Sequence, residues 1–321
     1  MIDFKLIRGG VFSSDINASR SYLMGIAIIL VVLYHTYCLI RGSIFGIFVP
    51  FTYGFIGVDI FLLINALGCC HSLQKNSLIK FYANRFKKAI PLFIIFAVIQ
   101  TLSYRHFTHF DYSAFDWFCN LSTLSYWHIG GQCIEWYICA SVVFWLLMPI
   151  LKWVVKHFGA VAIVVSVVVF ASIMKVSGTE WYHNCFLGRI PIFLLGIYLY
   201  FKEKANVYPF LVICAILVIS KCNGYMIISM LCPLLLLILL WIKNFINVNV
   251  ITWLGKYTLE IYLSNSIALY LFQQIYYNYS LDKPYCLIGY IALNTILTII
   301  FVHITRLTKI IAKTNHSQIS G

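Results

Sequence analysis

The sequence predicts an all-α polytopic membrane protein with about ten transmembrane helices. Of its 321 residues, 62% are hydrophobic and only 10% are charged, whereas soluble globular domains contain about 25% charged residues. Long apolar runs recur along the chain, and most approach the roughly 20 residues that cross a hydrocarbon core about 30 Å thick. These runs are continuous rather than alternating, which indicates helices and not the strands of a barrel.

The hydropathy pattern places the ten predicted spans at about residues 22–41, 48–71, 88–104, 134–152, 158–174, 186–201, 206–220, 225–242, 251–275 and 285–305. With the N-terminus in the cytoplasm, the inner segments carry sixteen Lys and Arg residues. The outer segments carry five, which are Arg41, Arg105, Lys175, Lys221 and Lys283. This positive-inside bias predicts that both termini are cytoplasmic. The expected location is the cytoplasmic (inner) membrane. Topology therefore explains the formal charge of +13, and nucleic-acid binding is not expected.

Three parts follow from these spans: a cytoplasmic N-terminal segment at 1–21, a single membrane domain at 22–305 and a cytoplasmic tail at 306–321. The first twenty residues have no 7–15-residue apolar core, so no cleavable signal peptide is expected. The longest polar connection, 105–133, lies on the outer side and is rich in aromatic residues. We expect it to fold against the bilayer surface.

Most of the eleven cysteines fall inside predicted spans, where thiols act as small apolar side chains. Cys119 and Cys133 flank the outer connection suitably for a bridge, but their spacing alone cannot establish one. The chain has no CxxC pair and no HExxH motif, so neither a metal site nor a permanently bound cofactor is predicted.

His35 ends the apolar run MGIAIILVVLYH and is the first candidate functional residue, because ionisable groups are rare inside membrane spans. A neutral imidazole can take a proton from a hydroxyl near neutral pH. The alternative is a ring held by a neighbouring helix, with a role in packing alone. Position 24 shares nearly the same helix face, roughly 16 Å away along the axis. A cation there could hold an anionic donor, but the residue is Met24.

Asp59 and Arg189 are also predicted to lie within spans. Asp59 could cap its helix or pair with Arg189, because a buried carboxylate needs a partner. Equally, it could orient an imidazole and stabilise its charged form. Arg189 precedes Pro191, a residue that suits the first helical turn, so we expect its side chain to reach the outer interface.

Arg85, Lys87 and Lys88 stand at the cytoplasmic start of the third span. Basic residues at such positions commonly anchor a helix to the membrane surface. Arginine also binds phosphate through paired donors. Arg85 therefore has two interpretations, and anchoring is the simpler one for the two lysines.

Six sequence segments are informative about function when they are taken together in their order along the chain. They are LMGIAIILVVLYH, GFIGVDIFLLINALG, FYANRFKKAIP, EWYICASVVFWLLMP, GRIPIFLLGIYL and LGKYTLEIYLSN. Together, from about residue 18 to 275, they resemble the acyltransferase-3 family of integral-membrane O-acyltransferases. That family transfers acyl groups, commonly acetyl from acetyl-coenzyme A, to hydroxyls of surface glycans and other acceptors. The resemblance implies that His35 is catalytic and that Asp59 and Arg85 support the site.

Three departures from the family pattern are visible. Met24 stands where the family has Arg or Lys, Asn65 and Ala66 replace a Ser-Gly pair, and Asn265 stands where His is common. Arg20 lies one turn before Met24 on nearly the same face. It could therefore replace the missing cation, and we predict an active but altered enzyme.

The predicted reaction brings acyl-coenzyme A to the cytoplasmic mouth. The donor-binding candidates are Arg20, Arg85, Lys87 and Lys88. His35 then acts as general base, or briefly carries the acyl group, with Asp59 orienting the ring. The acceptor is expected to be a glycan or lipid-linked glycan, on a side of the membrane that stays open. Glu135, Trp136 and Tyr137, at the outer mouth, could hold it, and an interfacial aromatic anchor is the equal alternative. The candidate ligands of the acceptor are Glu135, Trp136, Tyr137, Arg189 and Asn265.

Two other functions remain open at this stage. One is a transporter of a glycan or lipid-linked precursor, although neither inverted repeats nor broken helices are evident. The other is a non-catalytic family member within a glycan-assembly complex. The enzyme interpretation requires that the imidazole of His35 face a cavity in which donor and acceptor can meet.

Overall fold

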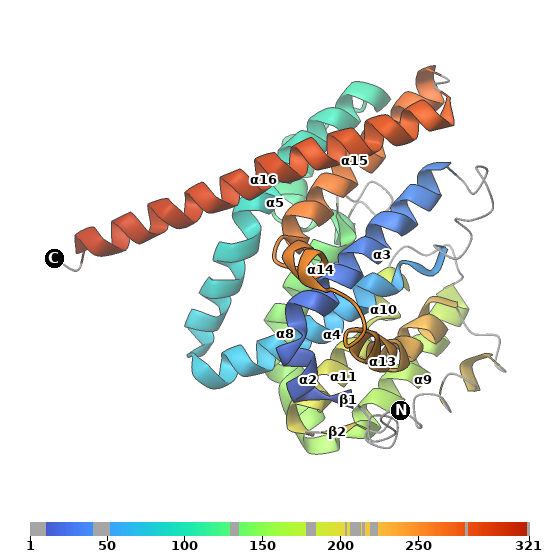
Figure 1. Ribbon diagram of the computed structural model, residues 1–321, viewed down its shortest axis with the longest axis vertical. Helices are drawn as coiled ribbons and strands as arrows, with labels where there is room; N and C mark the ends of the chain where they lie inside the picture. Colours follow the sequence, from blue (N-terminus) through green and yellow to red (C-terminus); the bar gives the residue numbers. More distant parts are fainter. Residues whose placement is uncertain are drawn as a thin grey trace.

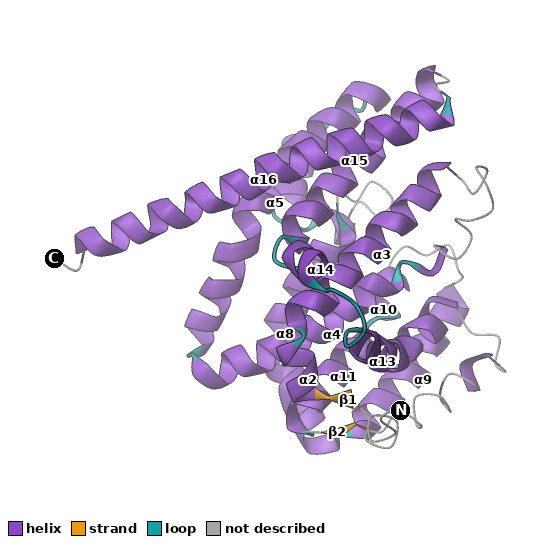
Figure 2. Cartoon of the chain, in the orientation of Figure 1, coloured by secondary structure: helices purple, strands orange, loops and turns teal. Residues whose placement is uncertain are grey.

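A computed structural model of the chain describes residues 11–40, 52–128, 135–177, 184–202, 204–205, 213, 216–218, 224–279 and 282–319. These residues are helical almost throughout, with one short two-stranded ribbon (Figures 1 and 2). The helices are α2 (Ser13–Ala18), α3 (Arg20–Ile40), α4 (Ile56–Lys75), α5 (Leu78–Thr108), α6 (Ala114–Leu121), α7 (Ser125–His128), α8 (Trp136–Phe158), α9 (Ala160–Ser177), α10 (Asn184–Leu187), α11 (Ile190–Phe201), α13 (Gly224–Ile242), α14 (Asn249–Leu254), α15 (Thr258–Tyr279) and α16 (Lys283–Ile319). The ribbon pairs β1 (Val11–Phe12) antiparallel with β2 (Lys204–Ala205).

Helices occupy every predicted span except the seventh, 206–220, which lies mostly outside the described residues. The predicted all-α membrane fold is therefore confirmed. Five helices are long and apolar enough to cross a membrane, namely Arg20–Leu39, Ile56–Lys75, Leu78–Thr108, Trp136–Phe158 and Pro284–Thr308. The apolar helices α9, α11 and α13 are shorter. The count of ten spans and the cytoplasmic termini stay predictions.

Two predicted boundaries are wrong. Helix α5 begins at Leu78 and not near residue 88, because Ser77 caps it and the first turns tolerate the basic residues that follow. The predicted ninth span, 251–275, is broken at Gly255 into α14 and α15. A Cβ atom on Gly255 would lie 1.7 Å from the carbonyl oxygen of Ser21. The break therefore seats the end of α14 directly against α3.

Helix α4 lies at the centre of the bundle and positions several of the candidate residues. Most of its side chains are buried on every face, as expected of a helix that is apolar all round. Gly57 lets it approach α3, because a Cβ there would lie 2.3 Å from the carbonyl oxygen of Ala27. Its opposite side contacts α11.

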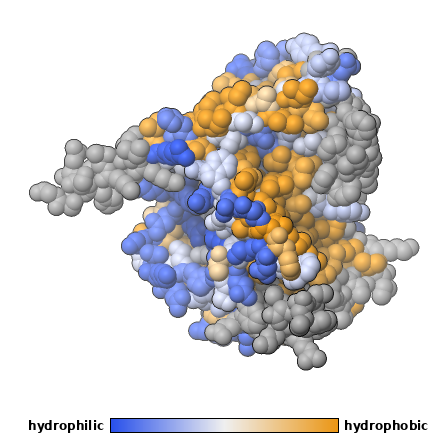
Figure 3. All heavy atoms as spheres, viewed as in Figure 1, coloured by the Kyte–Doolittle hydropathy of each residue, from blue (hydrophilic) through white to orange (hydrophobic). Residues whose placement is uncertain are grey.

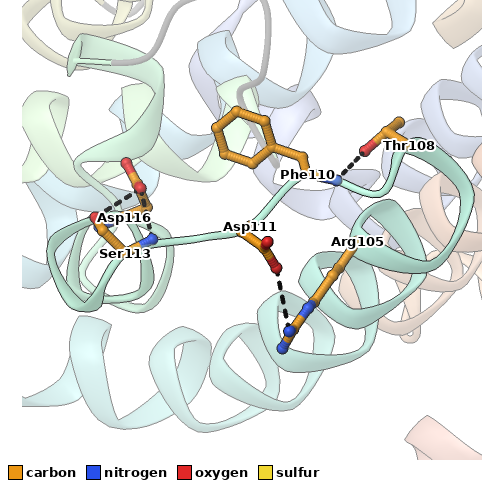
Figure 4. A network of polar contacts seen from close by, with 6 residues as sticks. All are labelled: Arg105, Thr108, Phe110, Asp111, Ser113 and Asp116. Carbon is orange, nitrogen blue, oxygen red and sulfur yellow. Dashed lines mark hydrogen bonds and ion pairs between the residues drawn. The ribbon is translucent and has the colours of Figure 1, made fainter.

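The outer connection 105–133 is partly helical in its described portion, which ends at residue 128. Figure 4 shows its polar contacts: Arg105 forms an exposed ion pair with Asp111 at 3.2 Å, and Ser113 and Asp116 form a capping box at the start of α6. Hydrogen bonds from Ser113 lower the pKa of Asp116. Cys119 is a buried free thiol, and Cys133 lies outside the described residues.

The surface in Figure 3 is divided by polarity. Apolar side chains gather along α15 and α16, whereas hydrophilic ones gather near the turn between α4 and α5. Large apolar residues of α16, such as Ile288 and Ile299, are more than 60% exposed. Such exposure suits contact with lipid and is costly in water.

Candidate functional site

A cavity of about 130 Å³ lies between α3, α4, α5, α8 and α15. Its lining residues are Arg20, Met24, Phe61, Asn65, Arg85, Lys88, Ala89, Tyr137, Ile138, Ser141, Trp145, Thr258, Leu259 and Tyr262. Three cationic side chains, one indole, two phenols and the hydroxyls of Ser141 and Thr258 therefore surround one small space. Three of the four predicted donor-binding residues are in this lining. The fourth, Lys87, is exposed and outside it.

Contacts between the helices show how the lining is layered. At one level, Trp145 of α8 and Arg85 of α5 both reach Asn65 of α4. At the other level, the ring of Tyr137 lies 6.0 Å from that of Phe61 and 5.1 Å from that of Tyr262. The cavity therefore has a cationic end and an aromatic end. Met24 also lines the cavity and adds an uncharged thioether.

Arg20 lies inside the cationic end, as the prediction of a substitute cation requires. Its Nη1 donates to the carbonyl oxygen of Ile64 at 3.4 Å. Gly68 makes room for the guanidinium, because a Cβ at that position would lie 2.8 Å from Nη1. The glycine of the second helix therefore has a direct role in placing Arg20.

Asn65, one of the departures from the family pattern, holds the second arginine. Its Oδ1 accepts from Arg85 Nη1 at 3.2 Å and from Trp145 Nε1 at 3.4 Å. No carboxylate of the described residues forms an ion pair with Arg20 or Arg85. Their positive charge is therefore left for an anionic ligand to neutralise, and guanidinium groups suit phosphate.

His35 is partly exposed on α3 and does not line this cavity. Its Nδ1 contacts the side-chain amide of Asn265 on α15, and the Tyr290 hydroxyl of α16 donates to the amide oxygen. The cavity ends at Tyr262, about one helical turn before Asn265. His35 therefore does not share the cavity that these cations line, and that its imidazole faces a cavity in which donor and acceptor meet stays a prediction.

Asp59 and Arg189 form a buried ion pair instead of contacting His35. The Arg189 Nε lies 3.3 Å from Asp59 Oδ1, and the two side chains are 2% and 0% exposed. Ser229 donates to the same carboxylate oxygen at 2.7 Å. Of the alternatives for Asp59, the pairing with Arg189 is confirmed, and a contact with the imidazole of His35 is not seen among the described residues. The prediction that the Arg189 side chain reaches the outer interface is wrong, because this side chain is buried beside the opposite charge.

The predicted acceptor residues have partners on several helices. Glu135 is buried and accepts hydrogen bonds from the hydroxyls of Tyr262 at 2.5 Å and Ser266 at 2.9 Å. The Arg189 guanidinium lies 4.9 Å from the centre of the Trp136 ring, and Tyr137 lines the cationic cavity. Glu135 and Tyr137 thus both contact Tyr262, and the role of these three residues in holding the acceptor stays a prediction.

Tyr262, Ser266 and Tyr290 were missed by sequence reasoning. A signal was present for the first two, because they flank Asn265 at three- and one-residue spacing in the polar patch of an otherwise apolar helix. Tyr290 had no such signal. Among the described residues, no three His, Cys, Asp or Glu side chains come together as metal ligands.

The fold defines a multi-pass helical membrane protein, and cationic side chains line one of its cavities. The family follows from comparison: the model of the acyltransferase-3 family, described as an acyltransferase domain, matches residues 21–305. The chain belongs to this family and is a membrane acyltransferase. Comparison with curated proteins and with solved structures gave no match.

Proposed function

We propose that the protein transfers an acetyl group from acetyl-coenzyme A to a hydroxyl of a cell-surface polysaccharide or of its lipid-linked precursor, with His35 as general base. The observation that carries this proposal is the pair of arginines, Arg20 and Arg85, that line a cavity without a carboxylate partner among the described residues. Phosphate groups of coenzyme A supply the missing negative charge. Lys88 lies at the same cavity and adds a third donor.

The donor must extend from this cavity toward His35. Fifteen residues separate Arg20 from His35 on one helix, which corresponds to about 22 Å along the axis. In coenzyme A, a long flexible arm separates the phosphates from the thioester, so one molecule can reach both groups. Along this path, the hydrogen bond between Tyr262 and Glu135 lies between the cavity arginines and His35. In this proposal, that contact opens when the arm passes.

The chemical step requires one base and no further cofactor. Nε2 of His35 removes the proton from the acceptor hydroxyl, and the oxygen attacks the thioester carbonyl carbon. The carbon–sulfur bond then breaks, and the coenzyme A thiolate takes up the proton from the imidazolium. In the second route, His35 first accepts the acetyl group and then passes it to the acceptor.

The test measures free coenzyme A released by the purified protein from acetyl-coenzyme A, with and without acceptor glycan. We expect acceptor-dependent release, and the loss of an acetyl mass from the host's surface glycans when His35→Ala replaces the native chain. Unchanged acetylation in the His35→Ala host would contradict the proposal. The same assay with Arg20→Ala and Met24→Arg tests which cation serves the donor: loss with the former and no change with the latter supports Arg20.

A second candidate, a non-catalytic family member in a glycan-assembly complex, is favoured by one observation. The cavity ends at Tyr262 and does not include His35. Met24, which lines it, is uncharged, whereas the family resemblance implies a cation at that position. This candidate predicts that deleting the gene abolishes surface acetylation, whereas His35→Ala leaves it intact. The two hosts therefore separate the candidates.

A further inference from the structure

A second polar cluster lies apart from the donor cavity, where the predicted outer end of α5 meets α15 and α6 (Figure 1). Its members, which we call the outer seam, are Gln100 and Tyr104 of α5, Tyr112 of the α5–α6 turn, Asn120 of α6 and Tyr270 of α15. The rings of Tyr104 and Tyr270 stack with their centroids 5.5 Å apart, and Tyr112 meets Tyr104 edge-on at 6.2 Å. Asn120 joins the same end of α5, because its amide donates to Thr101 at 3.2 Å.

Four members of the outer seam carry a buried polar atom that has no hydrogen-bond partner among the described residues. These atoms are Gln100 Oε1, Asn120 Oδ1 and the hydroxyl oxygens of Tyr112 and Tyr270. The side chains of Gln100 and Asn120 are 8% and 0% exposed. Buried polar groups nearly always have a partner, because leaving one unpaired is unfavourable. Four such atoms on one seam therefore indicate a ligand that is rich in hydrogen-bonding groups.

The turn that presents Tyr112 is held on both sides (Figure 4). On the preceding side, Asp111 pairs with Arg105 at 3.2 Å, and on the following side Ser113 caps α6. Burial raises the pKa of Tyr112, so its hydroxyl stays protonated at neutral pH and is a hydrogen-bond donor. The amide oxygens of the seam, in contrast, can only accept. The seam therefore offers both kinds of group in a fixed arrangement.

Helix α15 shows where the outer seam lies relative to the proposed reaction. Tyr262 ends the donor cavity, Asn265 contacts His35, and Tyr270 belongs to the seam. At 1.5 Å per residue, the three α15 positions follow one another over about 12 Å of the helix axis. The contact with the imidazole therefore stands between the donor cavity and the seam. Transfer from a donor on one side to an acceptor on the other requires this order.

We propose that the outer seam is a carbohydrate subsite that holds the acceptor glycan beside His35. The proposal rests on the proposed function, adds acceptor residues to it and commits the acceptor to the predicted outer side of the membrane. The amide oxygens of Gln100 and Asn120 accept hydrogen bonds from sugar hydroxyls. The phenols of Tyr112 and Tyr270 donate to sugar oxygens. The aromatic rings of the seam pack against the apolar C–H faces of the sugar rings.

The double variant Tyr112→Phe, Tyr270→Phe removes two hydroxyls and keeps both rings. The acceptor probe is the host's own surface polysaccharide, de-O-acetylated with mild alkali. We expect the KM for this glycan to rise about fivefold to a hundredfold, as for the loss of two hydrogen bonds, with the KM for acetyl-coenzyme A unchanged. Tyr82→Phe is the matched control, because that α5 hydroxyl donates to the carbonyl oxygen of Leu146. A native KM for the glycan in the double variant, or an equal rise in the control, would overturn the proposal.

Gln100→Leu distinguishes a ligand site from a role in packing. The amide oxygen has no partner among the described residues, so an apolar side chain of similar size should leave the thermal unfolding temperature unchanged or raise it. The KM for the glycan should nevertheless rise about threefold to tenfold. A native KM in this variant, whatever its stability, would indicate that the oxygen binds only water and would overturn the proposal.

A binding measurement separates the subsite from the proposed function. Saturation-transfer NMR with the de-O-acetylated polysaccharide detects contact between protein and glycan without any transfer. His35→Ala should keep the native signal, whereas the Tyr112→Phe, Tyr270→Phe variant should lose most of it. If His35→Ala retains transfer while the double variant loses the glycan signal, the proposed role of His35 fails and the subsite is supported. If His35→Ala abolishes transfer while the double variant keeps the native glycan signal, the subsite alone fails.

Discussion

The protein contains two arginine sites that differ in how their charge is balanced. Arg189 is 2% exposed, paired with Asp59 and covered by the Trp136 ring. Arg20 and Arg85 share a cavity wall and have uncharged oxygens as their acceptors, those of Ile64 and Asn65 respectively. The first site is neutral and closed, and the second is positive and hollow.

This difference teaches which arginines are available to a ligand. A buried ion pair satisfies itself and leaves neither group for substrate. Two neighbouring guanidinium groups repel each other. Their placement in the wall of one cavity therefore becomes favourable when an anion binds between them. We therefore propose that the ion pair stabilises the fold and that the cavity pair binds the donor. Predictions that test this division follow, from the largest expected effect to the smallest.

Breaking the ion pair should have the largest effect on stability. Asp59→Leu or Arg189→Met leaves a buried charge without a partner and should lower the free energy of unfolding by about 3–5 kcal/mol. The double variant should recover much of that loss. Thermal unfolding of the protein in detergent measures all three. Single variants with native stability but no transfer activity would instead place this pair in the active site.

Removing either cavity arginine should affect binding and not folding. Arg20→Ala or Arg85→Ala loses a charge-assisted hydrogen bond to phosphate, about 1.5–3 kcal/mol, so the Kd for coenzyme A should rise by about 10- to 150-fold. Calorimetric titration with coenzyme A measures this change. Lys87→Ala, an exposed cation outside the cavity, is the control. An equal effect in that control would indicate a general surface attraction.

Gly68→Ala should weaken donor binding less than loss of the arginine does, by about tenfold or less, because the added methyl group displaces the guanidinium of Arg20 without removing it. A double-mutant cycle provides the control. In an Arg20→Ala background, Gly68→Ala should have no further effect on the Kd, because it acts through that side chain. Additive losses would show that the glycine acts through helix packing.

The outer capping box should give the smallest effect and leave both arginine sites intact. Ser113→Ala removes the cap of α6 and should lower the free energy of unfolding by about 1 kcal/mol or less, with the Kd for coenzyme A unchanged. Ser113 lowers the pKa of Asp116. The stabilisation that this hydrogen bond gives is therefore complete above the ordinary carboxyl pKa and is lost as the pH falls through the lowered pKa. The difference in free energy of unfolding between the native protein and Ser113→Ala should therefore become smaller at acidic pH.

Much of the site could be predicted from local sequence. The motif in the first helix singled out His35, and the helical repeat placed Arg20 on the face of Met24. Arg20, Arg85 and Lys88 do line one cavity. Asn65 was noted only as a departure from a family pattern, because nothing in its neighbours shows that it faces Arg85, twenty residues away on another helix.

The sequence by itself determined the class of protein, because continuous apolar runs have no stable solution other than membrane helices. It also determined the order of the spans and the candidate ionisable residues. Tertiary structure alone decided that Glu135 contacts Tyr262 and that His35 contacts Asn265, and it selected Arg189 from the alternatives for Asp59. The physical reason is that helical periodicity specifies which face a residue occupies, whereas the opposing face belongs to a helix many residues away in the chain.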